Sequence, residues 1–290
     1  MKINRINAIP LVYNTSLTKG QNISEQSTNN SSFEFSSVSS SAIKSNALTS
    51  ISFKSNKLGS PEAIKKESEI IVEAFNIYAG VMQVFRNTAP DCAKEAKELY
   101  EMASDDIQNV SNDKCLTLRQ TIYNGEIVPH RLLRADGFGQ PIYSADFSKG
   151  KISQINAFDM AGNVSKVIKF NQETGALLSY QRNFGDENTE YNFLIEYDSE
   201  FTKYFESPTT EANGNKKYAK VIEFKNAERL EYKEDVITTP EGEELQAKRI
   251  FDFGNLNTFD YCSYFKKSQG EEPEYGEKIS VENNNMISWE

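Results

Sequence analysis

Residue types that commonly mark metal centres and catalytic sites are scarce in this chain of 290 residues. It has one histidine, His130, and three cysteines, Cys92, Cys115 and Cys262, which lie far apart in the sequence. Zinc and other transition metals need several such ligands at close spacing, so we expect no metal centre and no cofactor. An odd and sparse set of cysteines also fits free thiols better than a disulfide framework.

Recognisable catalytic motifs are missing as well. No serine or cysteine lies in a nucleophile elbow, no glycine-rich phosphate loop is present, and the acidic residues do not follow the spacing of a calcium-binding loop. An imidazole titrates near neutral pH and could act as a general base. However, His130 has no identifiable partner, so a histidine facing solvent is the simpler interpretation. The sequence therefore favours a protein that is not an enzyme.

Long apolar stretches are absent too. The apolar residues 8–12 are too few for the core of a secretory signal, and no run approaches the roughly 20 apolar residues that span a bilayer. We expect no membrane span, and a location that is either cytoplasmic or reached without a cleavable signal peptide.

Negative charge predominates, and it is unevenly distributed. The formal net charge is −10, but residues 1–60 carry six basic and two acidic side chains, which is +4, so the remainder carries −14. Such an acidic body repels phosphate backbones, which argues against nucleic acid as a partner.

The first 59 residues are rich in serine and asparagine. Fifteen serines fall within residues 16–60, with few large apolar side chains among them. Such a segment cannot bury enough apolar surface to offset the entropy lost on ordering, so we predict a disordered tail over residues 1–59. One alternative is that residues 1–55 act as an unfolded leader for export, of the kind found on bacterial effectors.

Helical signals begin where this tail ends. Ser60 is a good N-cap and Pro61 suits the first helical turn. Apolar residues then recur at helical spacing up to Phe85, and a second, narrower apolar stripe follows Pro90. Because residues 86–90 interrupt the pattern, we predict two helices that form an antiparallel hairpin over residues 60–112.

From residue 113 to residue 290 the apolar period changes from 3.6 to 2, which indicates β-strands. Glycines recur every twelve or thirteen residues at positions that favour tight turns. We predict about ten strands in an antiparallel meander, with turns at Gly125, Gly137, Gly150, Gly162, Gly175, Gly185, Gly214, Gly242, Gly254 and Gly270. The predicted fold is α+β and mainly β, with the helical hairpin packed on a large curved sheet that is either open or a half-barrel.

Part of this region resembles a known family. Phe158-Asp159 precedes the turn glycine Gly162 and the apolar Val164, and the pair Tyr197-Asp198 follows later. This arrangement resembles the tyrosine-aspartate (YD, or RHS-type) repeats, in which an aromatic-Asp pair precedes a turn glycine and an apolar strand. The resemblance implies repeated β units around residues 158–198. Family members form long shells or fibres, and this chain is too short for a shell.

Aromatic residues supply the only candidate site. If Tyr143, Phe147, Tyr204 and Phe205 face outward, they would form a platform for a protein, glycan or lipid. Our leading hypothesis is a non-enzymatic binding protein that presents a curved sheet to a partner. A hydrolase with a cleft in a half-barrel remains open, because two carboxylates that meet only in space leave no sequence signal.

Overall fold

The computed structural model describes residues 60–183, 192–225, 229–268 and 271–290. The chain divides into two units, Met1–Lys54 and Ser55–Glu290. The first unit lies outside the described residues, as do the predicted tail over residues 1–59 and the predicted turns at Gly185 and Gly270. The helix and the sheet described here belong to the second unit.

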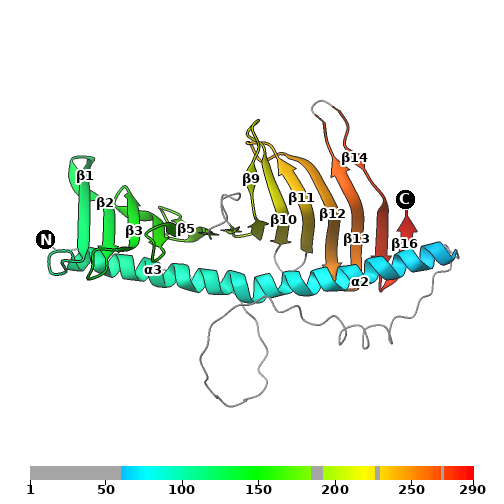
Figure 1. Cartoon of the computed structure of the whole chain (residues 1–290), viewed down its shortest axis with the longest axis horizontal. Coiled ribbons are helices and arrows are strands. Elements are labelled where there is room, and N and C mark those ends of the chain that lie inside the picture. The colour runs from blue at the N-terminus through cyan, green and yellow to red at the C-terminus, as the bar shows by residue number, and fades with distance from the viewer. Residues whose placement is uncertain (1–59, 184–191, 226–228, 269–270) are drawn as a thin grey trace, which may run out of the picture. The chain divides into compact units, whose positions relative to one another are not determined.

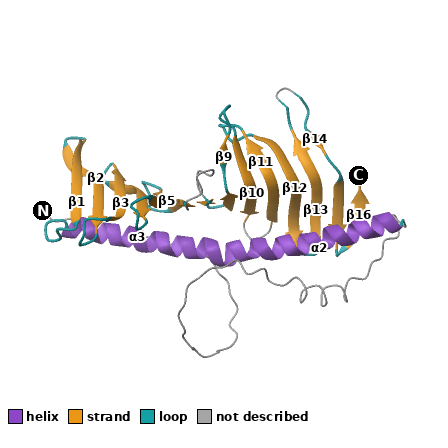
Figure 2. Cartoon of the chain, viewed as in Figure 1, coloured by secondary structure: helices purple, strands orange, loops and turns teal. Residues whose placement is uncertain are grey.

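A long helix opens the described part of the chain (Figure 2). It begins as predicted, because the Ser60 side-chain oxygen accepts a hydrogen bond of 3.1 Å from the Ala63 N–H and Pro61 lies in the first turn. Its three successive segments are α2 (Pro61–Gln83), the π-helical η1 (Val84–Thr88) and α3 (Ala89–Asn109).

The predicted helical hairpin over residues 60–112 is wrong, because the helix continues through Pro90. Val84, Thr88 and Ala89 all keep right-handed helical backbone angles. The Ala89 N–H donates to the Val84 carbonyl, five residues earlier, which is the wider π-helical turn. A proline lacks an N–H donor and crowds the carbonyl four residues before it. The wider turn accommodates both effects, so the helix does not end.

The rest of the described chain forms one antiparallel sheet. The strands are β1 (Leu116–Tyr123), β2 (Glu126–Ala135), β3 (Pro141–Ser148), β4 (Lys151–Phe158), β5 (Val164–Phe170), β6 (Leu177–Arg182), β7 (Phe193–Tyr197), β8 (Phe201–Glu206), β9 (Thr209–Thr210), β10 (Lys216–Lys225), β11 (Arg229–Thr238), β12 (Glu244–Asn255), β13 (Thr258–Lys266), β14 (Glu274–Tyr275), β15 (Lys278–Glu282) and β16 (Asn285–Trp289).

Neighbouring strands in the sheet follow chain order from β1 to β16, except that β9 pairs beside β10 and β14 beside β13. The two outermost strands, β1 and β16, do not pair with each other, so the sheet is open. The prediction of a mainly β fold, with an antiparallel meander packed against helical structure, is confirmed. Of the two predicted forms, the sheet adopts the open one.

Tight turns follow the glycine pattern at Gly125, Gly150, Gly162, Gly175, Gly214 and Gly242, whereas Gly254 lies inside β12. Asn124 and Gly125 form the two-residue loop between β1 and β2, with φ angles of 52° and 82°. Asparagine and glycine tolerate this left-handed conformation, which matches the twist of a hairpin. The loop between β2 and β3 differs from the prediction, because its left-handed residue is Gly139, with φ of 86°, rather than Gly137.

The helix crosses the strands from β16 to β2 and β3 (Figure 1). Its 23, 5 and 21 residues extend about 73 Å at 1.5 Å per residue. Fourteen strands spaced about 4.8 Å apart need roughly 62 Å, so one helix is long enough to contact them all. Contacts along the helix follow reverse strand order: Glu67 with β16, Tyr78 with β12, Phe85 with β10, Tyr100 with β5 and Asp106 with β3.

Side chains alternate between two different faces of the sheet. The face toward the helix carries a transverse row of directly opposed, mainly apolar residues: Leu132, Ala145, Ile155, Ile168, Tyr180, Ile195, Tyr204, Ile222, Tyr232, Phe251, Tyr261 and Ile279. The opposite face, called the polar face below, carries the adjacent row: Arg131, Asp146, Gln154, Lys169, Ser179, Glu196, Lys203, Glu223, Glu231, Asp252, Asp260 and Ser280. The helix therefore covers the apolar face of the sheet, and the polar face remains accessible for a binding site.

Candidate functional site

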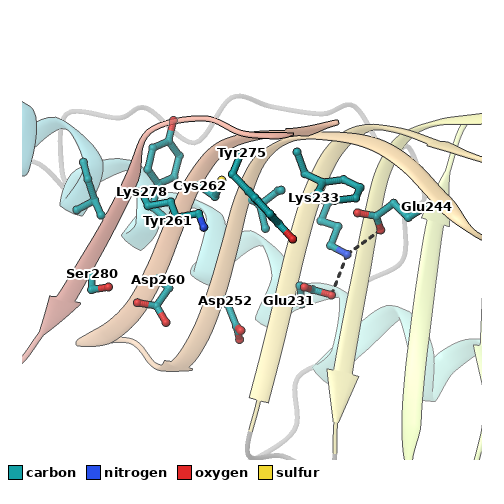
Figure 3. Close-up of a pocket in the computed structure, with 13 residues that line it drawn as sticks. Glu231, Lys233, Glu244, Asp252, Asp260, Tyr261, Cys262, Tyr275, Lys278 and Ser280 are labelled. Carbon is teal, nitrogen blue, oxygen red and sulfur yellow. Dashed lines mark hydrogen bonds and ion pairs between the residues drawn. The ribbon is translucent and has the colours of Figure 1, made fainter. Parts of the chain in front are cut away.

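A groove of about 500 Å³ lies over strands β11 to β15 (Figure 3). Acidic side chains outnumber basic ones in its lining. The charged lining residues are Glu231, Glu244, Asp252, Asp260, Lys233 and Lys278.

Strand register places the carboxylates of the groove side by side. Glu231 in β11 lies directly opposite Asp252 in β12, which lies directly opposite Asp260 in β13. Residues two positions apart point to the same face, so Lys233 and Cys262 join them on the polar face. Like charges directly opposite one another destabilise a sheet unless other groups compensate for them.

Lys233 compensates for two of these carboxylates. Its ammonium nitrogen lies 3.1 Å from Glu231 and 2.7 Å from Glu244. Burial disfavours the charged ammonium, but the attraction of Glu231 and Glu244 outweighs it and raises the pKa of Lys233 overall. The lysine therefore stays charged and fixes both carboxylates in place.

Arg229 compensates for Asp252. Its Nε lies 2.7 Å from one carboxylate oxygen, and a second guanidinium nitrogen contacts the other oxygen. The hydrogen bonds to Asp252 raise the pKa of Arg229. Asp260 differs, because its carboxylate is exposed and forms no hydrogen bond or ion pair with a described side chain, although its charge contributes to the raised pKa of Arg229. Asp260 is thus the carboxylate of the row that is open to a partner.

Strand β14 forms one wall of the groove. Tyr275 is 50% exposed, and its ring packs against Phe265 with ring centroids 5.4 Å apart. The Lys278 ammonium lies over the Tyr275 ring, 4.0 Å from the ring centroid. Gly276 permits this arrangement. A Cβ at that position would lie 2.2 Å from the Ser263 hydroxyl oxygen, so only glycine lets this segment approach β13.

Two irregular residues change the direction of neighbouring side chains in β11 and β12. Asp235 and Arg249 have φ angles of 47° and 45°, which is uncommon for residues other than glycine. They lie where the register between the two strands shifts. Arg249 pairs with Glu73 of the helix, while the next residue, Ile250, lines the groove. A β-bulge of this kind places an extra residue in one strand and changes the direction of the side chains beside it.

The arrangement is suited to binding through charge and aromatic contact. Three of the four carboxylates are held by ion pairs with Lys233 or Arg229.

His130 is exposed on β2 and is not part of the lining. Within the described ranges, no three His, Cys, Asp or Glu side chains are grouped so that they could hold a metal ion.

The four aromatic residues predicted as a platform are not brought together at the surface. Tyr143 and Phe147 are 0% and 8% exposed, and both belong to the core beneath the helix. Tyr204 stacks on Phe193 with ring centroids 5.6 Å apart, and Phe205 packs on Tyr218 at 5.1 Å. Tyr143 and Phe147 therefore cannot contribute to an exposed platform, because their rings complete the hydrophobic core.

Sequence reasoning missed the groove. Its residues come from five strands and are adjacent only because of the register. A usable signal was the alternation of charged residues in β11 and β12, with Glu231 and Lys233 on one face. That signal does not show which acidic residues become neighbours.

No family model matches the sequence, and no curated protein was found to be significantly similar to it. Among the described residues, no helix combines the length and the apolar character needed to cross a bilayer.

Proposed function

We propose that this chain is a non-enzymatic binding protein that holds a partner on the polar face of its sheet, with the groove over β11 to β15 as the anchoring point. One observation carries the proposal. The groove combines an exposed carboxylate that no described side chain holds in a hydrogen bond or ion pair, Asp260, with a half-exposed aromatic ring, Tyr275, in a setting of side chains already fixed by ion pairs. Groups that are fixed before binding lose little entropy when a partner arrives.

The partner that fits these groups best is an extended, basic protein segment. Four carboxylates face two lysines in the lining, and the chain beyond residue 60 carries a net charge of −14. A lysine or arginine of the partner can pair with Asp260, and its aliphatic part can pack beside Tyr275, whose ring already carries the Lys278 ammonium. Anionic lipid headgroups are repelled by this charge, and neutral glycans do not use it, so a protein partner is favoured over both.

A hydrolytic function has less support. Glycoside hydrolysis needs a protonated carboxylic acid beside a second carboxylate. In the groove, Glu231, Glu244 and Asp252 are each held by an ion pair with Lys233 or Arg229, so of the four lining carboxylates only Asp260 is available for that chemistry. The hypothesis of export through residues 1–55 concerns residues outside the described ranges and stays a prediction, as does the resemblance to YD repeats.

Peptide binding tests the proposal directly. We would titrate the full chain into labelled peptides of equal length that are basic, neutral or acidic, and follow fluorescence anisotropy. Basic peptides should bind, and added salt should weaken them because the contacts are partly exposed. Asp260→Asn and Tyr275→Ala should each weaken binding roughly two- to fivefold, as expected for the loss of an exposed ion pair or of a small apolar contact.

A matched control is Glu126→Gln, which removes an exposed carboxylate from β2, outside the groove. It should leave binding unchanged. If all three variants weakened peptide binding equally, the peptides would be attracted by the overall negative charge of the protein. That result would contradict the proposed site. If the chain bound glycans or lipid vesicles but no basic peptide, the proposal of a basic protein segment as the partner would be wrong. Turnover of a substrate that His130→Ala abolishes would overturn the non-enzymatic function.

A further inference from the structure

The two outermost strands of the sheet each have an unpaired edge in the described part of the chain. β1 pairs only with β2 and β16 only with β15, and they lie at opposite ends of the strand order (Figure 1). Proteins usually block such edges with proline, lysine or very short strands, because the unpaired N–H and C=O groups can bind another strand. β1 has eight residues with neither proline nor lysine, and β16 has neither proline nor any charged residue. The sequence therefore leaves both edges open to another strand.

The number of strands allows these two edges to pair between copies of the chain. The continuous path from β1 to β16 contains fourteen strands, and every neighbouring pair in it is antiparallel. Because this number is even, β1 and β16 run in opposite directions. A second copy placed beside the first, with its helix on the same face, therefore presents β1 antiparallel to β16, and the ladder can continue across the boundary.

The helix leaves the second half of β1 uncovered. Leu116 and Leu118, in the first half of the strand, belong to the core or pack against it. Ile122 lies on the same face, four residues after Leu118, yet it is 74% exposed, and its directly opposed partner Ile127 is 70% exposed. The hairpin of β1 and β2 thus presents two isoleucines on the helix face that no described residue buries.

The opposite end of the sheet has apolar groups that can cover this pair. Toward its N-terminus, helix α2 leaves the sheet at β16, where Glu67 accepts a hydrogen bond from the Met286 N–H. Pro61 lies six residues before Glu67, which is about 9 Å along the helix, or about two strand spacings. Ile64, in this protruding part, is 42% exposed, and Ile287 in β16 is 55% exposed. In a neighbouring copy, the first turns of this helix would lie over β1 and β2.

Charge along the strand order favours contact between unlike ends. Residues 116–182, which form β1 to β6, carry eight basic and five acidic side chains, which is +3. Residues 193–290, which include β7 to β16, carry twelve basic and 21 acidic side chains, which is −9. Pairing β1 with β16 brings the positive end of one copy to the negative end of another. Pairing β1 with β1, or β16 with β16, brings like charges together.

We propose that copies of this chain assemble head to tail, with the outer edge of β1 in one copy pairing with the outer edge of β16 in the next. The partner is thus a second copy of the chain. The contact uses the edges of the sheet and the first turns of the helix rather than the groove, so it goes beyond the peptide-binding role. Every oligomer keeps one unpaired β1 and one unpaired β16, so growth does not stop at a dimer.

The position of the helix determines which part of β1 pairs. Within each copy, the helix already covers the first half of β1, as the burial of Leu116 shows. The helix of the neighbouring copy can therefore lie only over the second half, near Ile122. Because that helix contacts its own β16 at Met286, Met286 lies opposite Ile122 across the boundary.

The faces of the two strands determine the remaining pairs. The register shift between β15 and β16 makes Ile287 the extra residue, so Met286 and Trp289 lie on the helix face and Ser288 on the polar face. The resulting register places Ile122 opposite Met286, Thr121 opposite Ser288, Gln120 opposite Trp289 and Arg119 opposite Glu290. The side chains of Arg119 and Glu290 are exposed and form no hydrogen bond or ion pair with a described residue, so they can pair across the boundary.

Sedimentation velocity of the full chain tests the assembly without any variant. We would measure it over a series of protein concentrations at low and at high salt. The distribution should move from monomer through dimer to larger species as the concentration rises. It should return toward monomer in high salt, because the two ends of the sheet carry opposite charge. A monomer at every concentration in low salt, or a dimer that does not grow, would overturn the proposal.

Cysteine pairs test the register. Thr121→Cys and Ser288→Cys would be made in separate chains, mixed and mildly oxidised, and the disulfides would be identified by peptide mass spectrometry. Directly opposed residues in an antiparallel pair have Cα atoms about 4.5–5.5 Å apart, which suits a disulfide. The mixture should form the 121–288 disulfide, and neither variant alone should link to itself. Linkage of Thr121→Cys to itself would indicate two-fold pairing of β1 and contradict the head-to-tail arrangement.

The matched control for the cross-link uses Ser280→Cys in place of Ser288→Cys. Ser280 lies directly opposite Ser288 on the same face, one strand further from the edge. Mixed with Thr121→Cys, it should form no disulfide. Equal linkage of both serine positions would indicate random collision and count against pairing at the edge.

Substitutions at the edge separate this contact from the groove. Ile122→Lys should weaken self-association roughly tenfold, because it removes a buried isoleucine from the contact and places a charge on the edge. Ile142→Lys is its matched control, since Ile142 is 44% exposed in β3, an interior strand, and should leave association unchanged. Asp260→Asn should also leave it unchanged. If Asp260→Asn abolished association and Ile122→Lys did not, copies would bind through the groove, and edge pairing would be wrong.

Discussion

The Tyr143 hydroxyl donates a hydrogen bond of 2.5 Å to the Asp106 carboxylate, joining the end of the helix to β3 across 37 residues of sequence. Arg134 of β2 contacts the same carboxylate at 2.5 and 2.6 Å. Burial raises the pKa of Tyr143, and the hydrogen bond to Asp106 raises it further. The phenol therefore stays protonated and acts as a donor.

A similar arrangement recurs at Glu95, three helical turns earlier. Its carboxylate accepts a hydrogen bond of 2.5 Å from the Tyr180 hydroxyl in β6 and pairs with Lys166 in β5. Each carboxylate thus connects the helix to two adjacent strands through a tyrosine and a basic residue. These contacts fix the position of the helix along the sheet more specifically than apolar packing alone.

Replacing Asp106 by Asn should destabilise the fold by about 3 kcal/mol, because the change leaves the Arg134 charge with only Asp113, 3.8 Å away, as an ion-pair partner. Asp106 is 7% exposed, whereas the neighbouring Asp105 is exposed. Asp105→Asn is therefore a matched control and should change stability by less than about 0.5 kcal/mol. Urea denaturation of both variants measures the difference. Equal stabilities would show that the Asp106 contacts contribute nothing beyond packing.

Glu95 should make stability depend on acid pH. Burial alone would raise the pKa of Glu95. Hydrogen bonds from Lys166 and Tyr180, together with the positive charge of Lys166, outweigh burial and hold the pKa of Glu95 below its usual value. A carboxylate with a lower pKa in the folded chain stabilises it above the unfolded value of about 4.3 and loses this effect as the pH falls through the folded value.

We therefore expect the stability advantage of the wild type over Glu95→Gln to be constant near neutral pH and to shrink below about pH 4. Denaturation series from neutral to acid pH would measure it. Glu98→Gln, an exposed change on the same helix, should show no such convergence. A wild-type advantage that did not shrink at all as the pH fell to the acid limit of the folded protein would contradict a lowered pKa of Glu95.

Gly276→Ala should destabilise the segment that carries Tyr275 by about 1–3 kcal/mol, through overpacking against Ser263 and Tyr264. An alanine at Gly137 meets no atom within 4 Å and requires no left-handed backbone, so Gly137→Ala should be nearly neutral. Thermal unfolding compares the two. If β14 shifts away from β13, Gly276→Ala should also weaken binding in the groove.

Cysteine reactivity should differ sharply between the core and the groove. Burial raises the pKa of Cys92 to about 12, so this thiol is protonated and enclosed at neutral pH. Cys262 is only half-buried and lines the groove. We expect maleimide to label Cys262 in the native chain and to label Cys92 only after unfolding, as measured by peptide mass spectrometry. Fast native labelling of Cys92 would contradict the packing of α3 on the sheet.

The sequence predicted local features well where a residue has one dominant physical role. Ser60 caps the helix, and the Asn124-Gly125 turn has the left-handed conformation that glycine signals. Turns without glycine were missed, including Asn283-Asn284, which reverses the chain between β15 and β16. The structure consequently has more strands than the expected ten.

The hairpin failed as a prediction because Pro90 was treated as a helix stop. Apolar residues on both sides of it, Phe85 and Cys92, contact the same continuous sheet. Their packing favours an uninterrupted helix, and one π-helical turn accommodates the proline. Tertiary contacts outweighed the local signal.

By itself, the sequence determined that an antiparallel meander forms after residue 113, because strand period and turn chemistry act over a few residues. Tertiary structure alone decided that one helix extends across those strands, and that Tyr143 is buried while Tyr275 is exposed. It also decided that Glu231, Asp252 and Asp260 become neighbours, as do Glu67 and the last hairpin. The physical reason is that register and packing join residues far apart in the chain, and no local pattern encodes those distances.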